Sequence, residues 1–190
     1  MNSQVIVGFD FTKSGRAAVQ RALALAARAP SHVLHFVCVV EPHWPLPAVP
    51  ASKVDYAYTE RVQEALMDEL NAELSVIAAK ERIHFNVHVR IGKPAQEILD
   101  LAREVGADLI IMGSKGLTGV ERFVLGSVSE KVAREAGCSV EIARPKTYDY
   151  VELTEVRDAD PKDHHAYVAP HRYYYEDRRV LKRPSEWPIG

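Results

Sequence analysis

Residues 108–132 read DLIIMGSKGLTGVERFVLGSVSEKV, an apolar run followed by a glycine-rich loop and a second apolar-polar segment. The run 108–112 is short and bounded by turn residues, which is typical of a buried β-strand. Glycines stand at 113, 116, 119 and 126, and Gly126-Ser127 lies where a helix over 127–135 is expected to begin. Such a loop packs poorly but lets a backbone approach another group closely. The stretch therefore predicts a strand, a binding loop and a helix in succession.

The same alternation extends over the chain from residue 5 to residue 143. The predicted strands, each rich in apolar residues, are 5–8, 32–40, 84–91, 108–112 and 139–143. The predicted helices, with apolar residues at helical spacing, are 14–28, 54–82, 94–104 and 127–135. Alternating strands and helices predict an α/β fold: one doubly wound, five-stranded parallel sheet with helices on both faces. The nearly continuous apolar character of the strands favours burial on both sides.

Bulk properties narrow the class of protein. The chain has 190 residues, a formal net charge of −2 and 47% hydrophobic residues, so it lacks the general basic field of a nonspecific nucleic-acid binder. Two cysteines, Cys38 and Cys138, are too few for a disulfide framework or a zinc cage. No run approaches the length of a membrane span and no secretion signal precedes the first strand. We expect a soluble, cytoplasmic protein without nucleic-acid or membrane partners.

The position of the glycine-rich loop indicates an anion site. In doubly wound sheets ligands bind beyond the carboxyl ends of the strands, where the strand order reverses, and here Asp10 and the loop follow the first and fourth strands. A P-loop does not fit, since Lys115 precedes Gly116. The G-x-G-x-x-G fingerprint does not fit either, since the glycines at 113, 116 and 119 are spaced by three. However, the first backbone N–H groups of a helix beginning at Ser127 would be unpaired and suited to phosphate.

The spacing Gly113-x2-Gly116-x9-Gly126-Ser127 resembles the G-x2-G-x9-G-[ST] signature of the universal stress proteins, in their ATP-binding branch. The resemblance covers roughly residues 3–145, and it implies a Rossmann-like fold of the adenine nucleotide alpha hydrolase-like type. It also implies ATP, with or without Mg²⁺, as the ligand, and a regulatory role in stress signalling. The family is often dimeric through its last strand, here about residues 139–143.

The resemblance also implies roles for individual residues. Asp10 would contact the ribose or a phosphate-bound metal, and the backbone at Val39 would read the adenine edge. Independently of the resemblance, charge makes Lys115 and Arg122 natural phosphate partners, although each is also compatible with a solvated loop cation. The remaining residues of the expected site, which would hold ribose and phosphates largely through backbone donors, are Met112, Gly113, Gly116, Gly126, Ser127, Val128 and Ser129.

Residues 146–190 lie beyond the expected domain of residues 1–145. This C-terminal extension is rich in tyrosine and histidine and has no persistent period. We expect it to extend the dimer interface or to cover the nucleotide. A zinc site is disfavoured because adjacent His164 and His165 do not easily face one metal, and no metal or catalytic residue is assigned.

Several alternatives stay open at this level. The glycine loop is also compatible with a plain structural turn, and Asp10 with a cap for Thr12–Ser14. The leading interpretation is an ATP-dependent switch or partner-binding module. A slow ATP hydrolase or phosphotransferase is a second possibility, although no residue is an evident base. A nucleotide-free interaction protein is the third.

Overall fold

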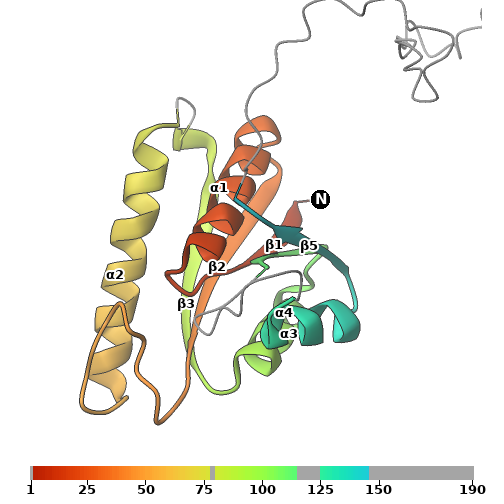
Figure 1. The fold of residues 1–190 in the computed structure, drawn as a ribbon. Helices are drawn as coiled ribbons and strands as arrows, with labels where there is room; N and C mark the ends of the chain where they lie inside the picture. Colours follow the sequence, from red (N-terminus) through yellow and green to blue (C-terminus); the bar gives the residue numbers. More distant parts are fainter. Residues whose placement is uncertain (1, 78–79, 115–124, 146–190) are drawn as a thin grey trace, which may run out of the picture. The chain divides into compact units, whose positions relative to one another are not determined.

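The sheet is the centre of the fold. The computed structural model describes residues 2–77, 80–114 and 125–145, and within them five strands form one all-parallel sheet in the order β3-β2-β1-β4-β5 (Figure 1). The strands are β1 Ser3–Gly8, β2 His32–Val40, β3 His84–Ile91, β4 Leu109–Gly113 and β5 Ser139–Ala143. The helices are α1 Lys13–Arg28, α2 Tyr56–Ser75, the 3-10 turn η1 Lys80–Arg82, α3 Pro94–Val105 and α4 Ser127–Glu135. The predicted α/β fold is therefore confirmed, and the strand order reverses between β1 and β4.

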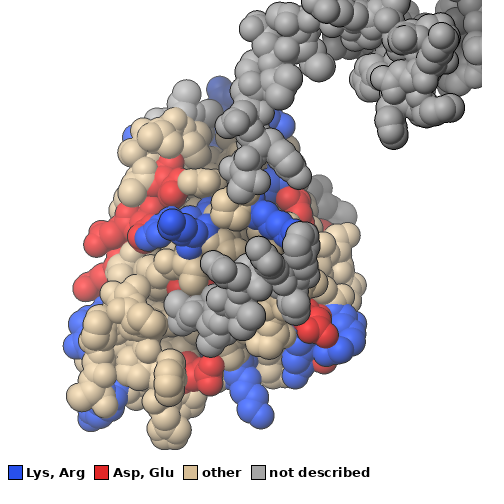
Figure 2. Space-filling view, viewed as in Figure 1, with Lys and Arg blue, Asp and Glu red and all other residues tan. Residues whose placement is uncertain are grey.

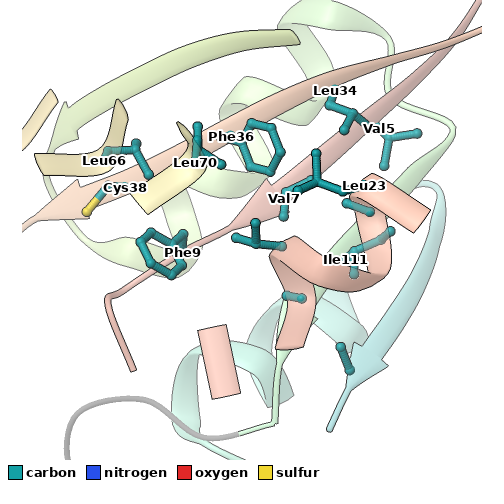
Figure 3. Packing of buried hydrophobic residues seen from close by; sticks show 14 of the residues in the cluster. Val5, Val7, Phe9, Leu23, Leu34, Phe36, Cys38, Leu66, Leu70 and Ile111 are labelled. Carbon is teal, nitrogen blue, oxygen red and sulfur yellow. The ribbon is translucent and has the colours of Figure 1, made fainter. Parts of the chain in front are cut away.

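Two apolar cores bury the two faces of the sheet. Along β1, Val5 and Val7 point into one core while Ile6 points into the other, and all three are fully buried. The first core joins β1 and β2 to α1 and α2, with Leu23, Phe36, Leu66 and Leu70 among its members (Figure 3). The second joins the opposite face to α3 and α4. Helices therefore cover both faces, as predicted.

The helix starts follow from local hydrogen bonding. The Oγ1 of Thr12 accepts from the Gly15 N–H at 3.0 Å and caps α1, and Asp55 caps α2 by accepting from the Tyr58 N–H at 3.0 Å. Helix α3 opens with Pro94, whose missing N–H costs nothing in the first turn. These caps fix where α1 and α2 begin and so how the chain leaves β1 and β2.

Two predictions were wrong, one about the length of a helix and one about the burial of the strands. The helix predicted over 54–82 spans only Tyr56–Ser75, and the chain continues through Val76 and Ile77, β-branched residues that favour helix weakly. The prediction of strands buried on both sides fails for the two edge strands: β3 alternates between exposed and half-buried residues over much of its length, and β5 is buried only at Ala143. In β3, Phe85, Val87 and Val89 pack against the first core, whereas no described β3 residue joins the second core.

The surface carries charges of both signs. Figure 2 shows acidic and basic side chains interspersed over one face of the described part, in keeping with the small net charge. Some are paired across elements, as where the Arg16 Nε donates to the Glu69 Oε2 at 2.9 Å between α1 and α2.

Among the described helices, none combines the length and apolar character that a membrane span requires. The expected C-terminal extension, 146–190, lies outside the described residues.

Candidate functional site

A pocket of about 250 Å³ lies at the carboxyl ends of the central strands, where the strand order reverses. Its volume is slightly below the roughly 300–1,000 Å³ typical of small-molecule sites. Every predicted site residue that the structure describes lines it: Asp10, Val39, Met112, Gly113, Gly126, Ser127, Val128 and Ser129. The other predicted residues, Lys115, Gly116 and Arg122, lie outside the described residues. The topology thus brings together residues that are more than 100 positions apart in the chain.

The pocket has an apolar side and a polar side. The apolar side is contributed by the end of β2, the β2–α2 loop and α3, through Val37, Val39, Leu46, Pro94 and Ile98. The polar side is contributed by the start of α4, residues 126–129, whereas Met112 at the end of β4 adds to the apolar lining. Apolar lining combined with a group of hydrogen-bond donors suits a ligand with a flat apolar part and an anionic part.

The donors on the polar side belong to the first turn of α4. Its N-cap, Gly126, has no side-chain oxygen to offer, and the first intrahelical bond runs from the Glu130 N–H to the Gly126 carbonyl at 2.9 Å. The backbone N–H groups of Ser127, Val128 and Ser129 therefore have no intrahelical acceptor. The Ser129 hydroxyl, by contrast, donates to the Gly126 carbonyl at 2.9 Å and is buried. In this arrangement Ser129 offers a ligand its backbone donor rather than its hydroxyl.

Asp10 takes part in the cap of α1 while lining the pocket. Its Oδ1 accepts from the Thr12 N–H at 3.1 Å and from the Thr12 Oγ1 at 2.6 Å. The capping role considered for Asp10 is therefore present in the structure, and it orients the carboxylate. The charge of Asp10 also reaches the thiol of Cys38: burial, with a smaller contribution from Asp10, raises the pKa of Cys38 to about 12.

Gly113 owes its identity to helix α1. A Cβ at this position would lie 2.6 Å from the Ser14 carbonyl carbon and 2.7 Å from the Ser14 carbonyl oxygen. Real Cβ atoms essentially never approach another heavy atom within 3.0 Å. The glycine therefore lets β4 and the first turn of α1 meet beside the pocket, which Gly15 and Gly113 both line.

Sequence analysis missed the part of the pocket wall that follows β2. Glu41, Trp44 and Leu46 line the pocket, although none of them was among the residues expected at the site. The loop is anchored because the Leu46 N–H donates to the buried Tyr58 hydroxyl at 2.7 Å. The sequence offered one signal for this part of the wall: an aromatic residue, Trp44, soon after the predicted strand 32–40.

The charge of the described pocket wall is negative. Among the described lining residues, the charged ones are Asp10 and Glu41. Across residues 2–77, 80–114 and 125–145, no three His, Cys, Asp or Glu side chains are grouped to hold a metal ion. A polyanionic ligand here would need a cation brought with it or supplied by residues beyond the described ones.

The model of the universal stress protein family matches residues 1–144. The chain belongs to the universal stress protein family. Universal stress protein MJ0531 of Methanocaldococcus jannaschii is 30% identical over 143 residues, which are 74% of this chain and 81% of that protein. Universal stress protein YxiE of Bacillus subtilis is 38% identical over 96 residues, half of this chain.

The match to YxiE of Bacillus subtilis spans 64% of that protein, just under two thirds of its length. A solved structure of a universal stress protein in complex with cAMP superposes with a TM-score of 0.53 and 27% identity, covering 75% of this chain and 96% of that one. A universal stress protein with this fold thus binds an adenine nucleotide.

Proposed function

We propose that this universal stress protein binds ATP in the pocket at the sheet reversal and acts as a nucleotide-dependent regulatory switch. The observation that carries the proposal is that all the described residues predicted from the glycine signature line one pocket. The pocket is lined both by a helix start without a side-chain cap and by apolar side chains. The cAMP complex of a relative supports an adenine nucleotide as the ligand class.

In this proposal the two sides of the pocket hold different parts of ATP. The phosphates are held by the backbone N–H groups of Ser127, Val128 and Ser129, where the helix dipole also favours negative charge. The adenine packs on the apolar side against Val39 and Met112. Its edge is read by the backbone of the β2 end.

The charge balance supports Mg²⁺ as the accompanying ion. Since Asp10 and Glu41 are the charged groups of the described wall, a triphosphate alone would meet repulsion there. Mg²⁺ neutralises phosphate charge and commonly bridges phosphates to one carboxylate, a role open to Asp10. We therefore expect ATP to bind more tightly with Mg²⁺ than in EDTA.

The switch requires a partner whose affinity differs between the free and ATP-bound forms. A second copy of the chain, paired through β5, is the proposed partner. The strand β5 is at the sheet edge, and its Glu141 is held by Arg21 of α1, with Nε and Oε1 2.5 Å apart. This arrangement leaves the outer backbone edge of β5 as the surface for pairing. Sedimentation velocity with and without ATP measures whether the dimer forms and responds.

The experiment for ligand binding combines two measurements on the full chain. Freshly purified protein is denatured, and the released small molecules are identified by mass spectrometry. Stripped protein is then titrated with ATP and Mg²⁺ by calorimetry at two temperatures. Co-purified adenine nucleotide, or one-to-one binding with a Kd in the micromolar range, is expected. No nucleotide and no binding heat at either temperature would refute the proposal and favour a nucleotide-free interaction protein.

A further inference from the structure

The loop between β2 and α2 presents a tryptophan at the mouth of the pocket. Trp44 lines the pocket and yet is 70% exposed. Tryptophan is highly buried on average in folded proteins, because its large ring loses much by staying in water. An indole left at a pocket mouth is therefore available to cover a ligand.

The backbone around Trp44 is held on both sides. The Trp44 N–H donates to the Glu41 carbonyl at 3.1 Å, and these two residues form an isolated antiparallel bridge. Two residues further on, Leu46 is buried and its N–H donates to the Tyr58 hydroxyl at 2.7 Å. The position of the indole relative to the pocket is thus set by the fold, while its exposed ring keeps room to adjust.

The indole belongs to the apolar side of the pocket. Trp44 shares this side with Val39, Leu46 and Ile98. The start of α4, with its backbone N–H groups, contributes the polar side. If the phosphates occupy the helix start, the base extends toward the apolar side. There it would meet aliphatic side chains. Among the described lining residues, the aromatic ones are Phe9, which is buried, and Trp44, whose exposed ring is available to cover the other face of the base.

We propose that Trp44 stacks on the nucleobase and closes the apolar side of the pocket over it. The inference rests on the proposed function and adds a specificity element to it: affinity depends on an aromatic base and not on the phosphates alone. Stacking of a base on an aromatic side chain contributes about 1–3 kcal/mol, so losing it weakens binding by about 5- to 150-fold.

The test compares two ligands and matched variants of the full chain. Calorimetry with ATP is expected to show affinity about 5- to 150-fold weaker for Trp44→Ala than for wild type. Trp44→Phe is expected to retain most of the wild-type affinity. The control is Tyr56→Ala, another aromatic residue that is 78% exposed but lies outside the pocket lining, and its ATP affinity should equal the wild type. Inorganic tripolyphosphate, which has no base, should bind Trp44→Ala and wild type equally.

The outcomes separate this inference from the proposed function. If wild type binds ATP and Trp44→Ala binds it equally well, stacking is refuted while ATP binding stands. If Trp44→Ala weakens tripolyphosphate as much as ATP, the effect is not on the base and stacking is again refuted. If wild type binds no ATP, both proposals fall. Circular dichroism checks that each variant is folded, which we expect for an exposed position.

A spectroscopic measurement reads stacking directly. The chain has two tryptophans, Trp44 and Trp187, so Trp187→Phe leaves Trp44 as the single fluorophore. Titration of this variant with ATP is expected to quench the emission in a saturable way, with the same Kd as calorimetry. Unchanged emission at ATP concentrations that saturate the calorimetric signal would overturn the inference.

Discussion

Replacement of Gly113 by alanine tests how α1 and β4 meet beside the pocket. The added Cβ would lie 2.6 Å and 2.7 Å from the carbonyl carbon and oxygen of Ser14, whereas ordinary contact begins at 3.4 Å. Both atoms are backbone, so no side-chain rotation relieves the clash and the helix must move. Overpacking of this kind costs about 1–3 kcal/mol. In a chain of this size that corresponds to a fall in Tm of about 2–12 °C.

The assay is thermal and urea unfolding of Gly113→Ala beside Gly137→Ala. Gly137 is the matched control, because a Cβ there meets nothing within 4 Å. We expect Gly137→Ala to unfold within about 0.5 kcal/mol of wild type, as surface changes usually do. Adding Ser14→Gly to Gly113→Ala should not restore stability, since the backbone contacts remain. Equal unfolding of the two alanine variants, or full rescue by Ser14→Gly, would refute this account of Gly113.

Three further predictions concern buried polar groups. His35 and His88 contact each other, with Nδ1 and Nε2 3.1 Å apart, and burial lowers the pKa of both rings, so the folded chain binds fewer protons. Stability should fall as pH drops below about 6.5, by up to about 1.4 kcal/mol per pH unit for each proton; a flat free energy of unfolding between pH 7.5 and 5.5 in urea titrations would contradict this. Tyr58→Phe removes the hydroxyl that accepts a hydrogen bond from the Leu46 N–H in the β2–α2 loop. The free energy of unfolding should fall by about 1–3 kcal/mol in the same assay, and no change would contradict this prediction. Cys38, with its pKa raised to about 12, should be alkylated by iodoacetamide more slowly than the half-buried Cys138 in native protein, which peptide mapping measures; equal rates would count against the buried thiol.

Much of the fold could be predicted because its signals are local. The strand β2 was predicted at its observed bounds, since nine mostly apolar residues between turn signals leave little choice. The end of α2 was missed, because the apolar period runs on through Ile77, which packs against the core without being helical. Periodicity reports which residues face the core, and not whether the backbone carrying them is still a helix.

Part of the candidate site could likewise be predicted from local sequence, and part could not. Residues 126–129 follow from a glycine and a helix start within a few positions of each other, so spacing alone indicates them. Trp44 depends on where the β2–α2 loop passes relative to β4, which is a tertiary fact. The reason for Gly113 was also hidden, because the atoms it makes room for belong to Ser14, nearly a hundred positions earlier.

The central claim is that the backbone donors at the start of α4 hold the phosphates of ATP. Ser127 is the first residue of α4 and follows Gly126, whose φ of −62° and ψ of 151° suit the position before proline. Ser127→Pro therefore deletes one N–H donor while keeping the helix start. The matched control, Ser127→Ala, removes only the hydroxyl and keeps that donor.

The decisive measurement is the calorimetric Kd for ATP with Mg²⁺ in wild type, Ser127→Pro and Ser127→Ala. The account predicts that Ser127→Pro weakens binding about tenfold or more, as expected for a hydrogen bond to a charged group worth about 1.5–3 kcal/mol. It also predicts an unchanged Tm without ligand and a much smaller effect of Ser127→Ala. ATP bound equally well by a folded Ser127→Pro variant would contradict it.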